Sequence, residues 1–292
     1  MNIEYEFLKS DTVNDFLYFT FPKYRLVFLT EDVETLCAIG VRVGKKPAGL
    51  IMSKLIPAEK KAVVLSVSVK SIHRRKGIAT NLFGKLEDFL LGNGYRTITI
   101  DYIKDSKSID YLEKILARCG WEEPEVKTML CKIHYKKLLK SGWLTKYGLP
   151  EEYSIFLWKD ISDEEKKIIF SYENKDGWYP HNLNPFTLGA NNQSPNSLGL
   201  KYNGQIIGWI IVQKLSKNAL NYARLFVCRD FQDMGKVIVM LAEAIKLQAK
   251  AKIAYGFFSF DMDNKRMKLF YEKRFKPYVS KTNARLSSFR LL

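Results

Sequence analysis

The segment Ala62-Val63-Val64-Leu65-Ser66-Val67-Ser68-Val69 is followed closely by the basic turn His73-Arg74-Arg75-Lys76-Gly77-Ile78-Ala79-Thr80, and these two runs decide the fold. The first run is rich in valine, which is typical of a β-strand. Beyond the turn, apolar residues return at intervals of three and four as far as residue 91, which predicts an amphipathic helix. They are Leu82, Phe83, Leu86, Phe89 and Leu90. The chain is therefore expected to pass from a strand through a glycine-containing turn into a helix.

The turn has the properties of an anion-binding site. The first N–H groups of a helix have no partner within the helix, and the helix dipole adds positive charge at the same end. Gly77 and Ala79 leave the backbone accessible, and Arg74, Arg75 and Lys76 add full positive charges. Because donors and charges occur together, the turn is predicted to bind phosphate groups.

The same residues resemble motif A of the GNAT superfamily, the acyl-CoA-dependent N-acyltransferases. That motif is Arg or Gln, two residues, Gly, one residue, and then Gly or Ala, between a strand and a helix. Arg74, Gly77 and Ala79 occupy these positions in the required context. The resemblance implies that the cosubstrate is acetyl-CoA or another acyl-CoA and that the turn holds its phosphates. The implied cofactor-binding residues of the turn are Arg74, Arg75, Lys76, Gly77, Ile78, Ala79 and Thr80.

The resemblance also assigns a role to the strand before the turn. In GNAT enzymes, backbone N–H groups of this strand bind the pantetheine arm and polarise the thioester carbonyl. Here these groups would come from Val67 and Val69. A regular ladder would consume both donors, so the assignment requires a bulged or splayed strand.

Length and composition indicate an ordinary globular protein. The chain has 292 residues, enough for two domains, with 47% hydrophobic and 27% charged residues. No apolar stretch is long enough to cross a bilayer, and the acidic, alternating start argues against a signal peptide. The cysteines are scattered and lack the spacing of a metal site or a disulfide framework. We therefore expect a cytoplasmic protein without a metal.

The net charge of +16 favours anionic partners, and CoA is itself polyanionic. A lysine-rich solvated surface explains the excess equally well. Basic and aromatic residues alternate at 132–137, but no nucleic-acid-binding motif accompanies them, so nucleic acid is not the expected partner. A nucleotide-binding P-loop is also excluded, because the glycines and lysines at 40–46 have the wrong spacing.

The chain repeats itself at an offset of roughly 155–160 residues, which is typical of a duplicated domain. Residues 48–55 correspond to 207–215, and residues 63–69 correspond to 221–227. Each half alternates strands and helices, which predicts an α/β (α+β mixed) fold of two tandem GNAT-like domains. Each domain is expected to have a mixed, mostly antiparallel twisted sheet flanked by helices. Gly and Pro residues place the boundary so that the domains are residues 1–143 and 144–292.

The second copy of the turn departs from motif A. In Gln232-Asp233-Met234-Gly235-Lys236-Val237 the Gln and Gly remain, but Val237 replaces the Gly or Ala. Val237 would crowd bound phosphates, and Asp230 and Asp233 would repel them. We therefore expect the first half to bind CoA and the second half to shape the substrate cleft.

The expected proton donor falls in the other half of the chain. In this family a tyrosine often protonates the leaving thiolate, and the run at 264–275 resembles the motif that carries it. Tyr271 has the position of that tyrosine, whereas the first half has Leu116 there. Tyr271 is thus either the general acid or a core aromatic retained from the duplication. Tyr111 is the replacement donor, and departure of the thiolate with solvent assistance is a third route.

A long aromatic loop in the second half is the expected acceptor-binding region. Such loops are usually functional, and this one lies where GNAT domains commonly build the acceptor pocket. The predicted contacts to the acceptor or acyl chain are Trp178, Tyr179, His181 and Phe186, and a packed structural loop is the alternative. No general base stands out. The weaker candidates are Ser66, Ser68, Glu34 and Asp101.

Together, these features predict an N-acyltransferase that moves an acetyl or other acyl group from acyl-CoA to a primary amine of a small molecule or peptide by direct attack. Two alternatives stay open. One is a non-catalytic tandem module that binds CoA or a partner, because a fold does not guarantee activity. The other is an aminoacyl-tRNA-dependent transferase, which would not need the phosphate-binding turn.

Overall fold

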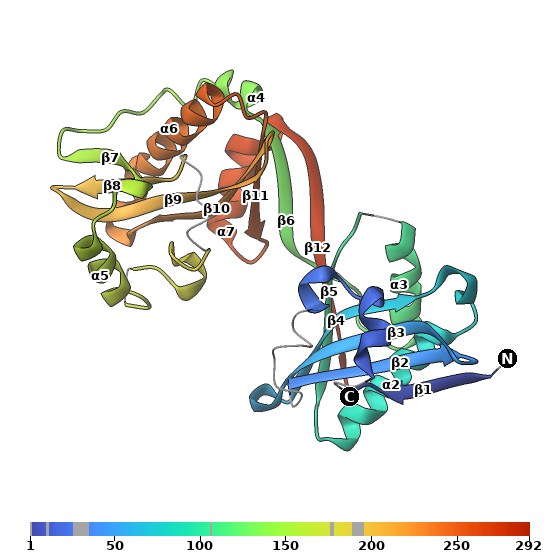
Figure 1. The fold of residues 1–292 in the computed structure, drawn as a ribbon. Helices are drawn as coiled ribbons and strands as arrows, with labels where there is room; N and C mark the ends of the chain where they lie inside the picture. Colours follow the sequence, from blue (N-terminus) through green and yellow to red (C-terminus); the bar gives the residue numbers. More distant parts are fainter. Residues whose placement is uncertain (1, 10–11, 26–34, 106, 176–177, 189–195) are drawn as a thin grey trace. The chain divides into compact units, whose positions relative to one another are not determined.

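The computed structural model describes residues 2–9, 12–25, 35–105, 107–175, 178–188 and 196–292. The chain forms two compact units (Figure 1). Unit 1 comprises residues 1–127 and 284–292, and unit 2 comprises residues 128–283. Each unit has a mixed sheet with helices packed against it, so the predicted fold class is confirmed.

The strands of unit 1 follow the order β1-β2-β3-β4-β5-β12. Neighbouring strands are antiparallel except β4 and β5, which are parallel. The elements are β1 (Ile3–Phe7), the 3-10 helix η1 (Val13–Phe19), β2 (Leu36–Val43), β3 (Lys46–Ile56), β4 (Lys61–Val69), α2 (Ile78–Gly92), β5 (Thr97–Ile103), α3 (Lys107–Arg118) and β12 (Val279–Leu291).

Helix α2 is held against the sheet of unit 1 by the apolar residues that the sequence pattern identifies. The side chains of Leu82, Phe83, Leu86 and Leu90 are completely buried. Burying one such side chain contributes about 1.5–3 kcal/mol, so this face fixes the position of α2. The residue before the helix is Gly77, whose φ of 77° turns the chain into its first turn.

Strands β4 and β5 pair only at their beginnings. The parallel ladder joins residues 61–64 to residues 97–100. On the other side of β4, the register with β3 shifts so that Leu65 is an extra, bulged residue. The part of β4 beyond the bulge therefore has β3 as its neighbour but is not joined to β5 by the ladder. These are the two features that the predicted roles of Val67 and Val69 require.

The strands of unit 2 follow the order β6-β11-β10-β9-β8-β7. Within this order β10 and β11 are parallel, and the other pairs are antiparallel. The elements are β6 (Glu125–His134), α4 (Tyr135–Leu139), β7 (Tyr153–Leu157), α5 (Asp163–Ser171), the 3-10 turn η6 (His181–Leu183), β8 (Leu198–Tyr202), β9 (Gln205–Ser216), β10 (Ala219–Val227), the 3-10 helix η8 (Arg229–Met234), α6 (Lys236–Lys250), β11 (Tyr255–Asp261), α7 (Lys265–Phe270) and a π-helical turn (Tyr271–Phe275).

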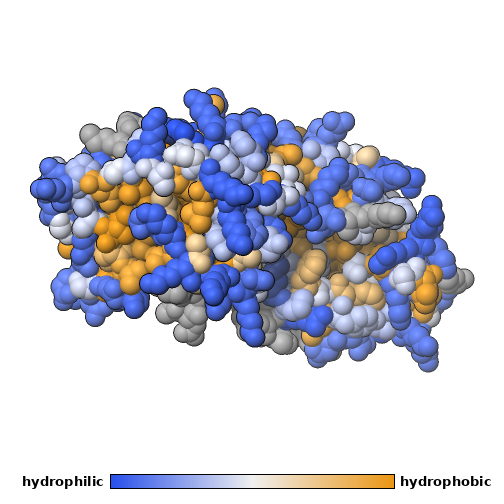
Figure 2. Space-filling view, turned by 90° about the horizontal axis from the view of Figure 1, so that it is seen from above, coloured by the Kyte–Doolittle hydropathy of each residue, from blue (hydrophilic) through white to orange (hydrophobic). Residues whose placement is uncertain are grey.

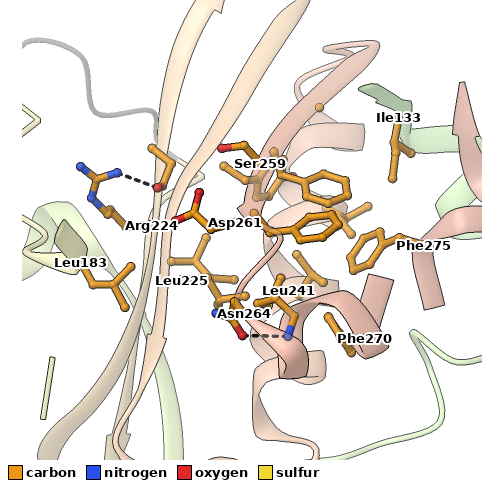
Figure 3. Close-up of a pocket in the computed structure, with 18 of the residues that line it drawn as sticks. Ile133, Leu183, Arg224, Leu225, Leu241, Ser259, Asp261, Asn264, Phe270 and Phe275 are labelled. Atoms are coloured by element: carbon orange, nitrogen blue, oxygen red, sulfur yellow. Dashed lines mark hydrogen bonds between the residues drawn. The ribbon is translucent and has the colours of Figure 1, made fainter. Parts of the chain in front are cut away.

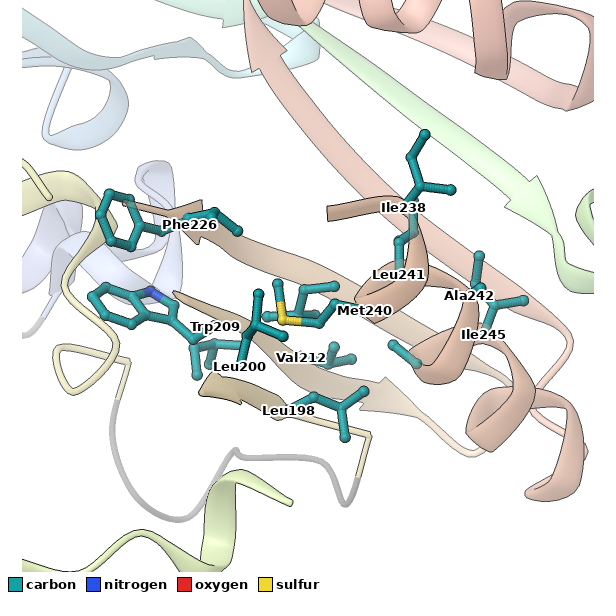
Figure 4. Close-up of a cluster of buried hydrophobic side chains, with 14 of the residues drawn as sticks. Leu198, Leu200, Trp209, Val212, Phe226, Ile238, Met240, Leu241, Ala242 and Ile245 are labelled. Atoms are coloured by element: carbon teal, nitrogen blue, oxygen red, sulfur yellow. The ribbon is translucent and has the colours of Figure 1, made fainter. Parts of the chain in front are cut away.

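The core of unit 2 lies between the sheet and α6 (Figure 4). Leu198 and Leu200 of β8 and Val212 of β9 are buried with Met240 and Leu241 of α6. The ladder between β10 and β11 is short, joining residues 219–221 to 255–257, and β10 has a bulge at Ala223. Unit 2 thus has the same parting of its two parallel strands as unit 1.

Matching backbone contacts confirm that the two halves share one fold. A Cβ on Gly49 would lie 2.7 Å from the Ser68 carbonyl oxygen, and a Cβ on Gly208 would lie 2.7 Å from the Phe226 carbonyl oxygen. Helices α2 and α6 each have 15 residues and follow a left-handed glycine. From β4 to β5 and from β10 to β11, equivalent residues are 158 positions apart in the sequence.

The last strand of each half of the sequence pairs with the sheet of the other half. The end of β12, at residues 285–291, pairs with β5 of unit 1, whereas β6 pairs with β11 of unit 2 through residues 128–134. Each unit is therefore completed by a strand from the other half of the sequence. The compact units divide at residues 127 and 284 for this reason, and the repeat boundary between residues 143 and 144 stays a prediction.

Hydrophilic residues cover most of the face shown in Figure 2, with apolar patches between them. This agrees with the high content of lysine and arginine. Among the helices that the structure describes, none is both long and apolar enough to cross a membrane.

Candidate functional site

The turn after β4 is tied to the end of that strand by a backbone bond and a side-chain bond. The Lys70 N–H donates to the Ala48 carbonyl of β3 at 2.8 Å, and residues 71–73 form a single 3-10 turn. Arg74 then folds back, and its Nε donates to the Val69 carbonyl at 2.9 Å. Arg74 therefore orients the turn as well as supplying charge.

Two residues of the turn have left-handed backbone conformations. The φ angle is 62° at Arg75 and 77° at Gly77. A non-glycine residue pays about 1–3 kcal/mol for such a conformation, and strain of this kind is concentrated at binding and catalytic sites. A Cβ on Gly77 would meet no atom of the described residues within 4 Å. Glycine is thus needed here for its φ angle, and the space beside the turn is open.

The N-terminus of α2 presents its first N–H groups beside this open space. The first hydrogen bond of the helix joins the Asn81 N–H to the Gly77 carbonyl at 3.0 Å. The N–H groups of Ile78, Ala79 and Thr80 precede it and lie at the positive end of the helix dipole. The exposed side chain of Arg75 adds charge next to them. The turn therefore has the donors and the charge that a phosphate group requires.

The bulged half of β4 directs donors toward the side where its ladder with β5 has ended. Successive residues of a strand point their N–H groups to opposite neighbours. Because the Lys70 N–H is directed to β3, those of Val67 and Val69 are directed away from β3. These two N–H groups are suitably oriented to bind an extended ligand beside β4.

The corresponding turn of unit 2 has a similar backbone but is covered by its own chain. Gln232 Nε2 donates to the Val227 carbonyl at 2.8 Å, and Gly235 has a φ of 70°. A Cβ on Gly235 would lie only 2.8 Å from Cδ1 of Tyr147. Lys236 is 1% exposed, and its Nζ lies 4.2 Å from the centre of the Tyr153 ring. An aromatic ring and a buried lysine thus take up the space that is open in unit 1.

Unit 2 also contains a cavity of about 320 Å³ at the place where β10 and β11 part (Figure 3). Helices α6 and α7 and the turn η6 contribute to its walls. The aromatic residues of the wall are Tyr135, Tyr222, Phe258, Phe260, Phe270 and Phe275. Polar groups are fewer, and the charged ones are Arg224 of β10 and Asp261 of β11.

Arg224 is a functional candidate that the sequence analysis missed. Its Nη1 donates to the Ala223 carbonyl at 2.9 Å, and its buried Nε has no partner among the described residues. Burial lowers the pKa of the Arg224 guanidinium, but arginine remains protonated in proteins. Its counterpart in unit 1 is Ser66, a buried hydroxyl that lies 2.8 Å from the hydroxyl of Thr20. A charged residue between apolar neighbours, Ala223 and Leu225, was the available signal.

Tyr271 lies in the hydrophobic core of unit 2. Its side chain is 7% exposed, and its ring centre lies 5.0 Å from that of Phe260. Burial raises the pKa of Tyr271, an effect increased by Cys131 and Glu272. Two counterparts in unit 1 are possible. The family motif gives Leu116, whereas the offset of 158 residues shared by β5, β11 and the starts of α3 and α7 gives Glu113. The assignment of Leu116 stays a prediction.

Glu113 belongs to a hydrogen-bonded pair that the sequence analysis also missed. The Tyr102 hydroxyl of β5 donates to Glu113 Oε1 at 3.1 Å. Burial and the neighbouring carboxylate raise the pKa of Tyr102. Tyr111, the other predicted proton donor, lies on α3 with 55% of its surface exposed. Of these two tyrosines of unit 1, Tyr111 is exposed and Tyr102 is buried and hydrogen-bonded.

The aromatic loop of unit 2 is largely a packed structural loop. Tyr179 is completely buried, its hydroxyl donates to the Ile169 carbonyl at 2.9 Å, and burial raises its pKa to about 12. Trp178 stacks on Tyr172, and Phe186 packs on Phe170. His181 is mostly exposed, with Nδ1 2.6 Å from a carboxylate oxygen of Glu173. The loop residues that line the cavity are Pro180, Asn182 and Leu183.

The candidates for a general base are not gathered at one point. Glu34 lies outside the described residues, and Asp101 is exposed on β5. Ser66 is hydrogen-bonded to Thr20, and Ser68 is half-buried on the bulged part of β4. Next to the turn, Nδ1 of His73 is buried and has no hydrogen-bond partner in the described part of the chain.

All four cysteines lie within the described residues, and none of them forms a disulfide there. Burial raises the pKa of Cys37 and of Cys131 to about 12, so neither is a reactive thiolate. Over the ranges that the structure covers, His, Cys, Asp and Glu residues form no group of three or more that could hold a metal ion.

Comparisons with known proteins agree with this geometry. Residues 5–117 match the model of the Acetyltransferase (GNAT) family. No curated protein matches the chain. Among solved structures, a tandem GNAT protein from the clavulanic acid biosynthesis pathway is 13% identical, with a TM-score of 0.65 over 99% of this chain and 98% of its own.

Two further structures have the same fold over the whole chain. A GCN5-related N-acetyltransferase from Sphaerobacter thermophilus is 13% identical, with a TM-score of 0.56 over 99% of this chain and 95% of its own. A probable N-acyltransferase from Enterococcus faecalis V583 is 11% identical, with a TM-score of 0.58 over 100% of this chain and 73% of its own. The chain therefore carries a domain of the GNAT acetyltransferase family in its first half and has a tandem GNAT fold throughout.

Proposed function

We propose that this protein is an N-acyltransferase that binds acetyl-CoA or another acyl-CoA in unit 1 and acylates a primary amine. The observation that carries the proposal is the difference between the two turns. Gly77 faces open space, whereas Gly235 is covered by Tyr147. The proposal is further supported by the family match, which covers residues 5–117 and includes the open turn.

In this proposal the diphosphate of CoA binds to the N-terminus of α2. Its donors are the N–H groups that follow Gly77, with added charge from Arg75 and Lys76, while Arg74 orients the turn through Val69. The pantetheine arm runs along β4, where the N–H groups of Val67 and Val69 are directed away from β3. The bulge at Leu65 supports this assignment, because it removes β4 from a regular ladder.

The reaction is a direct transfer. The amine nitrogen attacks the thioester carbonyl, a C–N bond forms, the C–S bond breaks, and the thiolate of CoA takes up a proton as the amine loses one. Exposure favours Tyr111 over the buried Tyr271 as a protein proton donor. The acceptor is an amine-bearing small molecule or peptide, and the proposed setting is the cytoplasm, where thiols stay reduced.

Binding of acetyl-CoA tests the first part of the proposal. A ligand present at 100 times its Kd stabilises the native state by about 2.7 kcal/mol, which raises the melting temperature by several degrees. Release of CoASH should follow when a panel of amines and peptides is added. No stabilisation by acetyl-CoA or by longer acyl-CoA would contradict the proposal.

A double variant assigns the binding to unit 1. Arg75→Glu with Gly77→Asp should abolish stabilisation by acetyl-CoA, because two carboxylates would replace a cation and an open glycine. The matched control is Arg229→Glu with Gly94→Asp, since Arg229 is exposed in η8 and Gly94 also has a positive φ and open surroundings. The control should bind normally. Loss of binding in the control alone would contradict the assignment of binding to the turn of unit 1.

The second candidate function is a non-catalytic module, which is favoured by the burial of Tyr271. Saturable binding of acyl-CoA without release of CoASH across the panel would support it. If the protein is instead an aminoacyl-tRNA-dependent transferase, the acceptor should be modified only when aminoacyl-tRNA is added. Acyl-CoA should then have no effect on the modification.

A further inference from the structure

The cavity of unit 2 is separate in sequence and construction from the proposed CoA site of unit 1. As in unit 1, the two parallel strands separate beyond a short ladder, here β10 and β11. The turn that would bind phosphates in unit 2, however, is covered. Tyr147 lies over Gly235, and the ammonium of Lys236 lies over the Tyr153 ring. A ligand of this cavity therefore has to be recognised without the phosphate-binding turn.

Two residues that line the cavity, Tyr222 of β10 and Gln248 of α6, close the gap between these elements through a chain of hydrogen bonds. The Tyr222 hydroxyl donates to Gln248 Oε1 at 2.7 Å, and Gln248 Nε2 donates to the Ile253 carbonyl at 2.9 Å. Gly256 makes this closure possible, because a Cβ there would lie 3.0 Å from Cε2 of Tyr222. The counterparts of Tyr222, Gln248 and Gly256 in unit 1 are the core residues Val64, Leu90 and Ile98. The polar closure is thus a feature of unit 2.

The walls next to this closure are apolar. Figure 3 shows Phe270 and Phe275 on one side of the cavity and Leu225 of β10 on the other, with Leu241 between them. A volume of about 320 Å³ lies at the lower end of the range for ligand pockets, about 300–1,000 Å³. The space suits one apolar chain or ring system and is too small for a whole CoA molecule.

One polar group in the wall lacks a partner. Arg224 follows the bulged residue Ala223 in β10, and its Nη1 donates to the Ala223 carbonyl. Its Nε is buried and has no hydrogen bond among the described residues. Arg224 is also the one cation among the described residues that line the cavity, and a carboxylate is the group that best pairs with a guanidinium, since it can accept two parallel hydrogen bonds. Asp261 does not meet this need, since it is exposed and its Oδ1 accepts a bond from Thr128.

We propose that the cavity of unit 2 binds an apolar monocarboxylate, with its hydrocarbon part among the phenylalanines and its carboxylate on Arg224. The proposal concerns unit 2 and does not rest on acyltransfer in unit 1. It gives the second half of the chain a binding role of its own. The covered turn cannot contact phosphates, and Arg224, next to the bulged residue of β10, supplies a cation instead.

Three probes with the same chain and different head groups test the proposal: decanoate, decan-1-ol and decylamine. By calorimetric titration of the full chain, decanoate should bind saturably with one site, at least tenfold tighter than decan-1-ol. Decylamine should bind more weakly than both, because its ammonium would face Arg224. Equal binding of decanoate and decan-1-ol would overturn the role of Arg224, and no saturable binding of decanoate would overturn the site.

Two variants locate the binding. Arg224→Met should weaken decanoate at least tenfold and leave decan-1-ol nearly unchanged, whereas Arg229→Met removes an exposed arginine of η8 and should change neither. If Arg224→Met does not fold, Arg224→Lys keeps a cation and should retain preference for decanoate over decylamine. A final test is competition between acetyl-CoA and decanoate in the double variant Arg75→Glu with Gly77→Asp. If the two ligands still compete there, acetyl-CoA binds in the cavity of unit 2, and the proposal is overturned.

Discussion

Arg74 and Gln232 make the same bond in the two units. Arg74 Nε donates to the Val69 carbonyl at 2.9 Å, and Gln232 Nε2 donates to the Val227 carbonyl at 2.8 Å. In both cases a side chain closes the turn onto the strand five residues earlier. The shared role is therefore structural, and charge is the property that Arg74 adds.

The two roles of Arg74 can be separated by substitution. Arg74→Gln should keep the bond to Val69, as Gln232 does in unit 2, and should weaken acetyl-CoA binding only about threefold. Arg74→Ala loses the bond as well and should weaken binding about tenfold or more, since a hydrogen bond of this kind is worth about 1 kcal/mol. Calorimetric titration measures both. Equal losses in the two variants would contradict the structural role, and Gln232→Ala should leave acetyl-CoA affinity unchanged.

Arg75 holds a conformation that favours glycine, with a φ of 62°. Arg75→Gly should therefore raise the free energy of unfolding by about 0.5–1 kcal/mol in urea denaturation, despite the greater freedom of the unfolded chain. The same change removes a cation beside the turn and should weaken acetyl-CoA binding. Opposite signs in the two measurements are the expected result. If Arg75→Gly is less stable than the wild type and binds acetyl-CoA with unchanged affinity, the left-handed conformation of Arg75 is not maintained for acetyl-CoA binding.

Tyr271 is expected to act through packing rather than through its hydroxyl. Tyr271→Phe keeps the ring against Phe260 and should change kcat less than twofold, while Tyr271→Ala should destabilise unit 2 by about 3–5 kcal/mol. Tyr111→Phe is the matched test at the exposed site on α3. A large loss of kcat in Tyr271→Phe, without a change in melting temperature, would instead identify Tyr271 as the general acid.

Glu87 should make stability depend on pH. This buried carboxyl of α2 accepts hydrogen bonds from Trp121 Nε1 at 3.0 Å and from Arg290 Nη1 of β12 at 2.9 Å. Burial raises the pKa of Glu87 above 4.5 despite both partners. The folded state therefore binds this proton more tightly than the unfolded state, and the contribution of Glu87 to stability falls as pH rises from 4.5 through the raised pKa.

The variant Glu87→Gln isolates this effect because it cannot titrate. The free energy of unfolding of the wild type, relative to Glu87→Gln, should fall as the pH rises from about 4 to 7 and should then stay constant. Urea denaturation at a series of pH values measures the difference. A difference that grows with pH would mean that Trp121 and Arg290 outweigh the cost of burial.

Much of the fold follows from the sequence because its determinants are local. Valine-rich β4, the glycine before α2 and the spacing of Leu82, Phe83 and Leu86 each act over a few residues, and the same pattern occurs again in the second half. The repeat, and the backbone form of the turn that is proposed to bind phosphate, could be predicted for this reason. The counterpart of Tyr271 in unit 1 stays a prediction, because the family motif gives Leu116 whereas the spacing from β5 gives Glu113.

The sequence by itself determined two tandem GNAT-like halves and the glycine-containing turn of the first half, for which anion binding is proposed. Only the tertiary structure decided that Tyr147 and Lys236 cover the second turn, that Arg224 lines a cavity, and that β6 and β12 are exchanged between the units. Tyr147 lies 88 residues before Gly235, and β12 lies far beyond β5. Contacts over such separations depend on how whole strands and helices pack, and no local pattern of residues records them.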